Sequence, residues 1–133
     1  MFETNDDARQ NPAYRKTYIF FLLIMRLYIA VLDEFPDYMV PTLVAHSMLA
    51  AHLQMQDHPQ YQTWLPIFKK CTVRVNQKEF DKIAALPGTY LGHENKTLDA
   101  RKSCAIPLPV DDSALPNVLK FAKLWKPVVA PSS

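Results

Sequence analysis

Apolar and polar positions along this chain change period several times, and these changes predict an α/β fold. Residues 26–32, RLYIAVL, are almost continuously apolar and rich in β-branched and aromatic side chains, which is typical of a strand buried on both faces. The second strand is expected at residues 69–76, where apolar and polar side chains alternate as in a half-buried strand. The third and fourth strands are expected at residues 89–95 and 103–109.

Three helices are expected between and after these strands. The first runs from about Pro41 to about Met55 and is apolar nearly all round, which predicts a central helix packed on the sheet. Residues 77–86 form an amphipathic helix, and residues 111–125 open with a capping type of residue and continue as the last helix. The order β-α-β-α-β-β-α therefore predicts a four-stranded mixed sheet flanked by helices.

The length of 133 residues suggests one domain, expected at residues 25–126, with a flexible tail at 127–133. The dense apolar run before Arg26 resembles the start of a signal sequence, but that arginine interrupts it and no small-residue cleavage site follows. We interpret residues 1–24 as an extension upstream of a natural start at Met25. The alternative is a membrane tether over residues 17–32, which requires that residues 26–32 are not a strand. No stable membrane insertion is expected.

Composition and charge narrow the function classes. The net charge of +2 is uneven: residues 1–67 carry 4 basic and 7 acidic side chains, and residues 68–133 carry 11 and 6. The second half therefore suits an anionic partner, or is simply a solvated basic surface. Two unpaired cysteines favour a reduced cytoplasmic compartment and no zinc site. Only two glycines occur, which argues against a glycine-rich loop that cradles phosphate.

Several strings resemble the archaeal and eukaryotic type of peptidyl-tRNA hydrolase over about residues 27–126. YIAVLDEF is similar to the family's first strand, with Glu34 and Phe35 at the match, and LVAHSMLAAH is similar to its Ala-rich helix. KKCTVRVNQKEFDKIAAL and CAIPLPVDDSALPNVL are similar to the basic strand with its helix and to the last strand with its exit. The resemblance implies a type-two peptidyl-tRNA hydrolase fold, and either hydrolysis of an ester on tRNA or binding of tRNA.

Two family motifs differ in this chain. No Lys-Gly-Lys precedes the first helix, and the family's Asp-Ala-Gly-x-Thr region is matched by LGHENKTLDA with a different spacing. These differences keep open a second hypothesis, a catalytically inactive member of the fold that binds a protein or another ligand. Neither hypothesis implies a cofactor or a metal, and a homodimer is left open.

An active site is expected where the first strand ends and the first helix starts, near the loop after the third strand. Ester hydrolysis needs a base that activates water and donors that hold the oxyanion, and RNA needs cations for its phosphates. The expected catalytic residues are His93, Glu94, His46 and Thr97. The expected substrate-binding residues are Asp33, Glu34, Asn95, Lys96, Arg101 and Lys102.

The roles of these residues stay open at several points. His46 or His93 is the base, Glu94 or Glu34 orients it, and Asn95 or Thr97 donates to the oxyanion. Against this, the apolar helix neighbours of His46 favour its interpretation as a hydrogen-bonded core histidine over a role in the site. GHENKT is equally read as a polar strand end and turn, and His52 as packing or surface.

Overall fold

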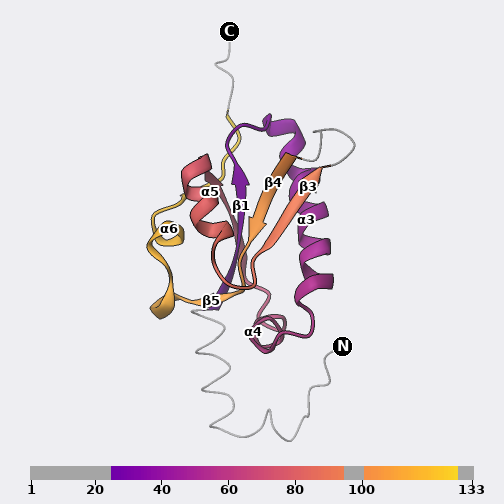
Figure 1. The fold of residues 1–133 in the computed structure, drawn as a ribbon, viewed down its shortest axis with the longest axis vertical. Coiled ribbons are helices and arrows are strands. Elements are labelled where there is room, and N and C mark those ends of the chain that lie inside the picture. Colours follow the sequence, from indigo (N-terminus) through magenta and orange to yellow (C-terminus); the bar gives the residue numbers. More distant parts are fainter. Residues whose placement is uncertain (1–24, 95–100, 129–133) are drawn as a thin grey trace, which may run out of the picture.

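The computed structural model describes residues 25–94 and 101–128 of the chain. These residues fold into a mixed sheet with helices on both faces (Figure 1). Of His93, Glu94 and Arg101 only the backbone is described. The α/β class and the mixed, helix-flanked sheet are therefore confirmed. The predicted number of four strands is wrong, because the described residues form six.

Up to the fourth strand the elements follow the predicted order, with one additional short helix before the second strand. The strands are β1 Met25–Leu32, β2 Lys70–Val75, β3 Tyr90–Glu94, β4 Arg101–Ile106, β5 Val110–Asp111 and β6 Lys123–Leu124. The α-helices are α3 Val40–Met55, α4 Pro59–Trp64, α5 Gln77–Ala84 and α6 Asn117–Lys120, with single 3-10 turns at Asp37–Met39 and Asp112–Ala114.

Strand β1 lies in the middle of the sheet, whose order is β3-β4-β1-β2-β6. It is parallel to β2 and antiparallel to β4, and β4 is antiparallel to β3. Strands β1, β2 and β3 therefore run in the same direction, and their carboxyl ends meet at one edge. The start of α3 lies at the same edge, which is uppermost in Figure 1.

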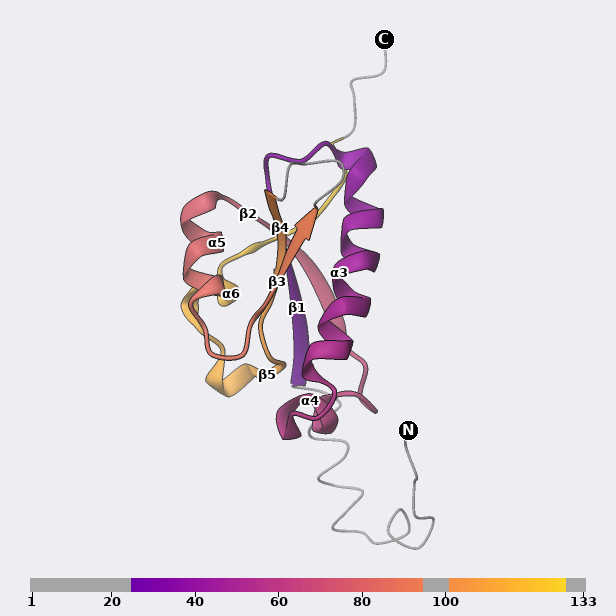
Figure 2. The same cartoon turned by 45° about the vertical axis from the view of Figure 1, so that its right-hand side comes forward.

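The continuous apolar run of β1 is explained by helices on both sides of the sheet. Figure 2 shows α3 on one face and α5 with α6 on the other. Tyr28, Ala30 and Leu32 belong to the core cluster that contains buried residues of α5 and of the start of α3. Leu27 and Ile29 belong to the cluster that contains buried residues of α4 and of the end of α3. The prediction of a strand buried on both faces is confirmed.

The predicted helix over residues 111–125 is wrong. Pro116 lacks an N–H and disfavours a helical conformation at the preceding residue, and Leu115 is accordingly extended at φ −70°, ψ 120°. The helix therefore begins only at Asn117 and has four residues. The chain then pairs with β2 as β6, so the C-terminal segment adds a strand to the sheet. Strand β4 likewise ends before Pro107, short of the predicted residue 109.

Helix α3 is less buried than its apolar sequence suggests. Its buried positions are Val40, Leu43, Ser47, Ala51 and Met55, a stripe three or four residues apart. Leu49 and Leu53, in contrast, are 67% and 62% exposed. The prediction of a helix packed on the sheet is confirmed for one face of α3, and nothing in residues 25–94 and 101–128 covers the opposite face.

The segment after β6 is attached to the sheet by Asp37 and Arg74. An Arg74 amino group lies 3.0 Å from Asp37 Oδ1 and donates to the carbonyl of Lys126 at 2.8 Å, and its guanidinium lies 5.2 Å from the ring centroid of Trp125. The backbone N–H of Val128 donates to the other Asp37 oxygen. These contacts hold residues 125–128 beside the end of β2.

Acid is expected to loosen this attachment. The Val128 N–H and the Arg74 guanidinium lower the pKa of Asp37 below its usual 3.8. A carboxylate with a lowered pKa stabilises the folded state above its unfolded-state pKa, and this contribution is lost as the pH falls through the lowered value. We therefore expect exchange of the Trp125 amide, which donates to Thr72 O at 2.9 Å, to accelerate at pH values below about 4 relative to its intrinsic rate.

The control for this prediction is a pair of matched carboxamide variants. Asp37→Asn should remove the acid-dependent step in Trp125 protection, whereas Asp57→Asn, at an exposed position after α3, should keep it. An acid-dependent step that persists unchanged in Asp37→Asn would contradict the account.

No helix within residues 25–94 and 101–128 is long and apolar enough to cross a membrane. Residues 25–32 form the central strand, so the alternative of one membrane tether over residues 17–32 is wrong. The predicted extension at residues 1–24 lies outside the described residues.

Candidate functional site

Polar side chains from neighbouring strands form a row along the carboxyl edge of the sheet. Ala30 pairs with Ala105 and Val31 with Cys104, and continuing this register places Asp33 opposite Lys102. Lys102 is itself paired with His93. Neighbouring strands are about 4.8 Å apart, so the backbones of Asp33 and His93 lie roughly 10 Å apart.

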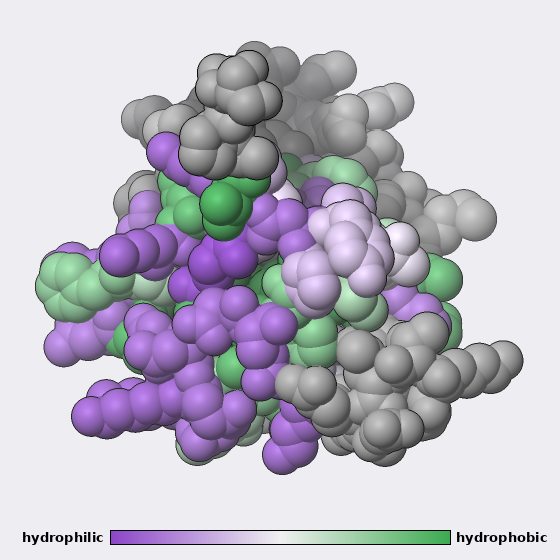
Figure 3. Space-filling model, turned by 90° about the horizontal axis from the view of Figure 1, so that it is seen from above, coloured by the Kyte–Doolittle hydropathy of each residue, from purple (hydrophilic) through white to green (hydrophobic). Residues whose placement is uncertain are grey.

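The same row continues toward β2 and β6. The Asp33 N–H donates to the carbonyl of Val75 at 2.8 Å, which places Asn76 beside it. Arg74 pairs with Lys123, and continuing that antiparallel register brings Phe121 level with Asn76. Figure 3 looks onto this edge and shows many hydrophilic residues with apolar surface between them.

The structure places the predicted binding residues at this edge as far as they are described. Asp33, Glu34 and Lys102 are exposed there. The side chains of His93, Glu94 and Arg101 are not described, but β3 ends and β4 begins at this edge. Three predicted site residues, Asn95, Lys96 and Thr97, lie outside the described residues.

His46 is exposed on α3. The interpretation of this residue as a core histidine is therefore wrong: its position lies beside the buried stripe of the helix, not within it. The neighbouring Ser47 lies against Gly92 of β3. The backbone of His46 is thus close to the end of β3, although its side chain is open to solvent.

Gly92 allows the close approach between α3 and β3. A Cβ atom at this position would lie 2.7 Å from Ser47 Oγ and 3.2 Å from Ser103 Oγ, so a larger residue would collide with buried hydroxyls. The register of β3 and β4 also shifts between Leu91 and His93. Such irregularities change the direction in which the following side chains point, and they are common beside active sites.

His52 has a structural partner. Its Nδ1 lies 2.8 Å from the hydroxyl of Tyr61, which joins the end of α3 to α4. Burial raises the pKa of Tyr61, so the phenol is protonated at neutral pH. Of the two expectations for His52, packing or surface, this contact agrees with packing.

A polar cavity of about 270 Å³ opens at the carboxyl edge on the side of α5. Its walls are Asp33, Arg74, Asn76, Glu79, Phe121 and Lys123. Glu79 and Asn76 form a capping box, with Asn76 Oδ1 accepting from the Glu79 N–H at 2.8 Å and Glu79 Oε1 accepting from the Asn76 N–H at 3.0 Å. This reciprocal pairing fixes one wall of the cavity.

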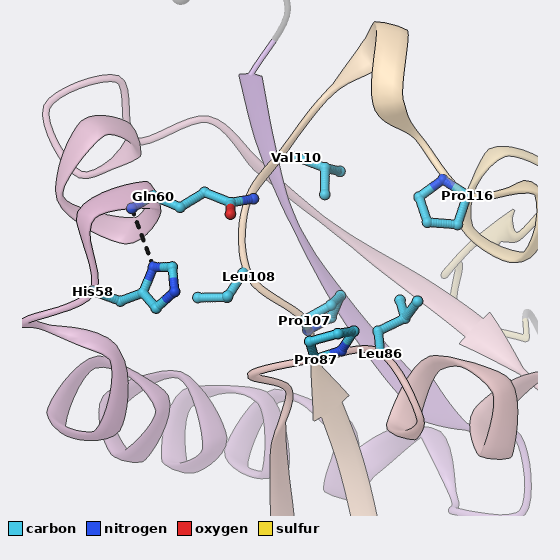
Figure 4. Close-up of a pocket in the computed structure, with 8 residues that line it drawn as sticks. All are labelled: His58, Gln60, Leu86, Pro87, Pro107, Leu108, Val110 and Pro116. Carbon is cyan, nitrogen blue, oxygen red and sulfur yellow. Dashed lines mark hydrogen bonds between the residues drawn. The ribbon is translucent and has the colours of Figure 1, made fainter.

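A second cavity, of about 330 Å³, lies near the amino end of β1 (Figure 4). Three prolines and three aliphatic residues form most of its wall, namely Leu86, Pro87, Pro107, Leu108, Val110 and Pro116. His58 and Gln60 supply its polar groups, and His58 Nδ1 accepts from the Gln60 N–H at 3.1 Å. That bond caps the start of α4, so His58 has a local structural role.

The described residues 25–94 and 101–128 contain no group of three or more His, Cys, Asp or Glu side chains that could hold a metal ion. No protein-family model matches the chain, and no curated protein matches it. The resemblance to peptidyl-tRNA hydrolases therefore stays a prediction from the sequence strings.

Sequence reasoning missed Asn76, Phe121 and Lys123 as neighbours of Asp33. Asn76 lies between two correctly predicted elements, where an N-cap residue at a strand end gives a usable signal. Phe121 and Lys123 were assigned to a long helix. Only the pairing of β6 with β2 brings them to the edge, and this pairing is not local in sequence.

Proposed function

We propose that this protein is a divergent peptidyl-tRNA hydrolase-like protein that binds tRNA at the carboxyl edge of its sheet and hydrolyses an ester carried by it. The observation that carries the proposal is the row that puts Asp33, Lys102 and the end of β3 at one edge. In open α/β sheets, ligands bind outside the carboxyl ends of the strands.

The proposed chemistry divides between a base and a set of phosphate contacts. His93, at the end of β3, takes a proton from water as the water attacks the ester carbonyl. The ester C–O bond then breaks, and the imidazolium gives the proton to the tRNA hydroxyl that leaves. Glu94 or Glu34 orients the imidazole. Arg101 and Lys102 contact phosphates and set the position of the RNA. Exposed His46, near the same strand end, is the alternative base.

The inactive binding module remains the second candidate, and the missing Lys-Gly-Lys favours it. Binding and hydrolysis are therefore tested separately. The affinity for tRNA tests RNA binding at the carboxyl edge, which the hydrolase and an inactive RNA-binding module would have in common. A protein-binding module would show no such affinity.

The affinity of the full chain for tRNA is expected to fall steeply with salt, because each phosphate contact releases counterions. Arg101→Glu/Lys102→Glu should weaken binding at every salt concentration and reduce the slope of log K against log salt by about two. Fluorescence anisotropy of labelled tRNA measures both quantities.

The matched control places the same charge change elsewhere. Lys78→Glu/Lys82→Glu alters two exposed lysines of α5 and should change the slope by much less. Equal losses in the two double variants would mean that binding depends on net charge alone, and the site at the carboxyl edge would then be wrong.

A further inference from the structure

The polar cavity beside Asp33 has the composition of a nucleotide subsite. Phe121 is 73% exposed and forms part of its wall, with Lys120 Nζ 5.7 Å from its ring centroid, so an exposed aromatic side chain lies next to polar groups. Base–aromatic stacking is one of the two sequence-tolerant contacts by which proteins bind single-stranded nucleic acids, beside cations on the phosphates. An exposed phenylalanine at a polar cavity therefore points to a planar, polar ligand.

The charges of the cavity argue against a bare anion. Arg74 and Lys123 supply two cations, and Asp33 and Glu79 supply two carboxylates. The Arg74 guanidinium is bound to Asp37 and to the Lys126 carbonyl, so Lys123 is the exposed cation of the wall. A free phosphate would meet two carboxylates, whereas a ligand that carries both hydroxyls and one phosphate can satisfy both signs.

A ribonucleotide has these features in one molecule. The ribose hydroxyls donate to a carboxylate such as Asp33, the phosphate accepts from Lys123, and the base stacks on Phe121. Acidic side chains read ribose hydroxyls in the same way in dinucleotide-binding folds. The volume of about 270 Å³ is near the lower end of ligand sites, which suits one nucleotide and no more.

We propose that the cavity formed by Asp33, Asn76, Phe121 and Lys123 is a binding subsite for a single ribonucleotide. This proposal deepens the proposed function and rests on it only in naming RNA as the source of the nucleotide. Asp33 borders both the cavity and the row that leads to His93, and the backbones of Phe121 and Asp33 lie roughly 10 Å apart. A nucleotide in the cavity would thus lie beside the proposed ester site.

The test is a titration of the full chain with adenosine 5′-monophosphate, followed through the backbone amide signals of residues 76, 121 and 123 by NMR. Saturable shifts centred on these residues are expected. Phe121→Ala should weaken binding by at least about fivefold, because stacking on an exposed ring is lost. Phe68→Ala removes another exposed phenylalanine outside the cavity and should leave the affinity unchanged.

Two ligand comparisons test the other contacts. The 2′-deoxy nucleotide should bind more weakly than the ribonucleotide to the native chain, but the two should bind equally well to Asp33→Ala, which lacks the acceptor for the hydroxyl. Adenosine should lose less affinity than the nucleotide on Lys123→Ala. A tetranucleotide of RNA that binds more tightly than the monophosphate identifies RNA as the source, and equal affinity identifies a free nucleotide.

Absence of saturable shifts, or equal affinity of the native chain and Phe121→Ala, would overturn the proposal. These outcomes are independent of hydrolysis, because no ester is present in the titration. A protein that binds the nucleotide but cleaves no tRNA ester would keep the subsite and lose the proposed hydrolase activity.

Discussion

Trp64→Ala is expected to lower the free energy of unfolding by about 3–5 kcal/mol, the range for removal of a large aromatic side chain from a core. Trp64 is completely buried and packs against Tyr61, with ring centroids 5.3 Å apart. Its indole N–H donates to the carbonyl of Lys69 at 2.7 Å. The substitution therefore leaves a cavity and also removes the donor for a backbone carbonyl.

Phe68→Ala is the matched control. Phe68 stacks on Trp64, with ring centroids 6.0 Å apart, but it is 60% exposed, so its loss should cost less than about 1.5 kcal/mol. Chemical denaturation of the two variants measures the difference. Equal destabilisation would contradict the placement of Trp64 in the core between α4 and the sheet.

The elements that sequence reasoning predicted correctly are those with a strong local pattern. Strand β1 has a continuous apolar run, and α5 has apolar residues on one side, so period alone places them within one or two residues. The apolar pattern could not show which face of α3 is buried. Apolar residues occur on both sides of that helix, and only its packing against Gly92 and β3 separates Ser47 from exposed Leu49.

The prediction of one helix over residues 111–125 failed for two reasons. It disregarded the effect of Pro116 on the preceding residue, and the pairing of β6 with β2 has no local pattern in the sequence. Pro116 stands six residues into the expected helix, where it prevents the helical conformation of Leu115. Strand β6 has two residues, too few for any period, and it exists because β2 offers an edge. The wall of the proposed nucleotide subsite depends on this pairing, so this wall could not be predicted from the sequence.

The candidate site also has a part that the sequence predicted and a part that only the structure shows. The expectation that the ends of the first and third strands meet came from the family resemblance and from the general rule for open sheets. The parallel direction of β1 and β3 agrees with it. The register that sets Asp33 opposite Lys102 required the structure. The roles of His93 and Glu94 stay predictions, since only their backbone is described.

The hydrolysis of an N-blocked aminoacyl-tRNA by the full chain tests the central claim most directly. The account predicts release of the N-blocked amino acid, and a rate for His93→Ala that is lower by about 100-fold or more, because a positioned general base contributes roughly 10²–10⁴-fold. His58→Ala is the matched control. His58 is exposed at the opposite end of the sheet, so its removal should leave the rate within about twofold of the native value.

The outcomes of this assay separate the hypotheses. Cleavage that His93→Ala abolishes and His58→Ala preserves would mean that the chain carries out ester hydrolysis with the residues at the end of β3. Cleavage that survives in His93→Ala but is lost in His46→Ala would move the base to α3. No cleavage above the background rate by the folded protein at high concentration would contradict the hydrolase account and leave a binding role.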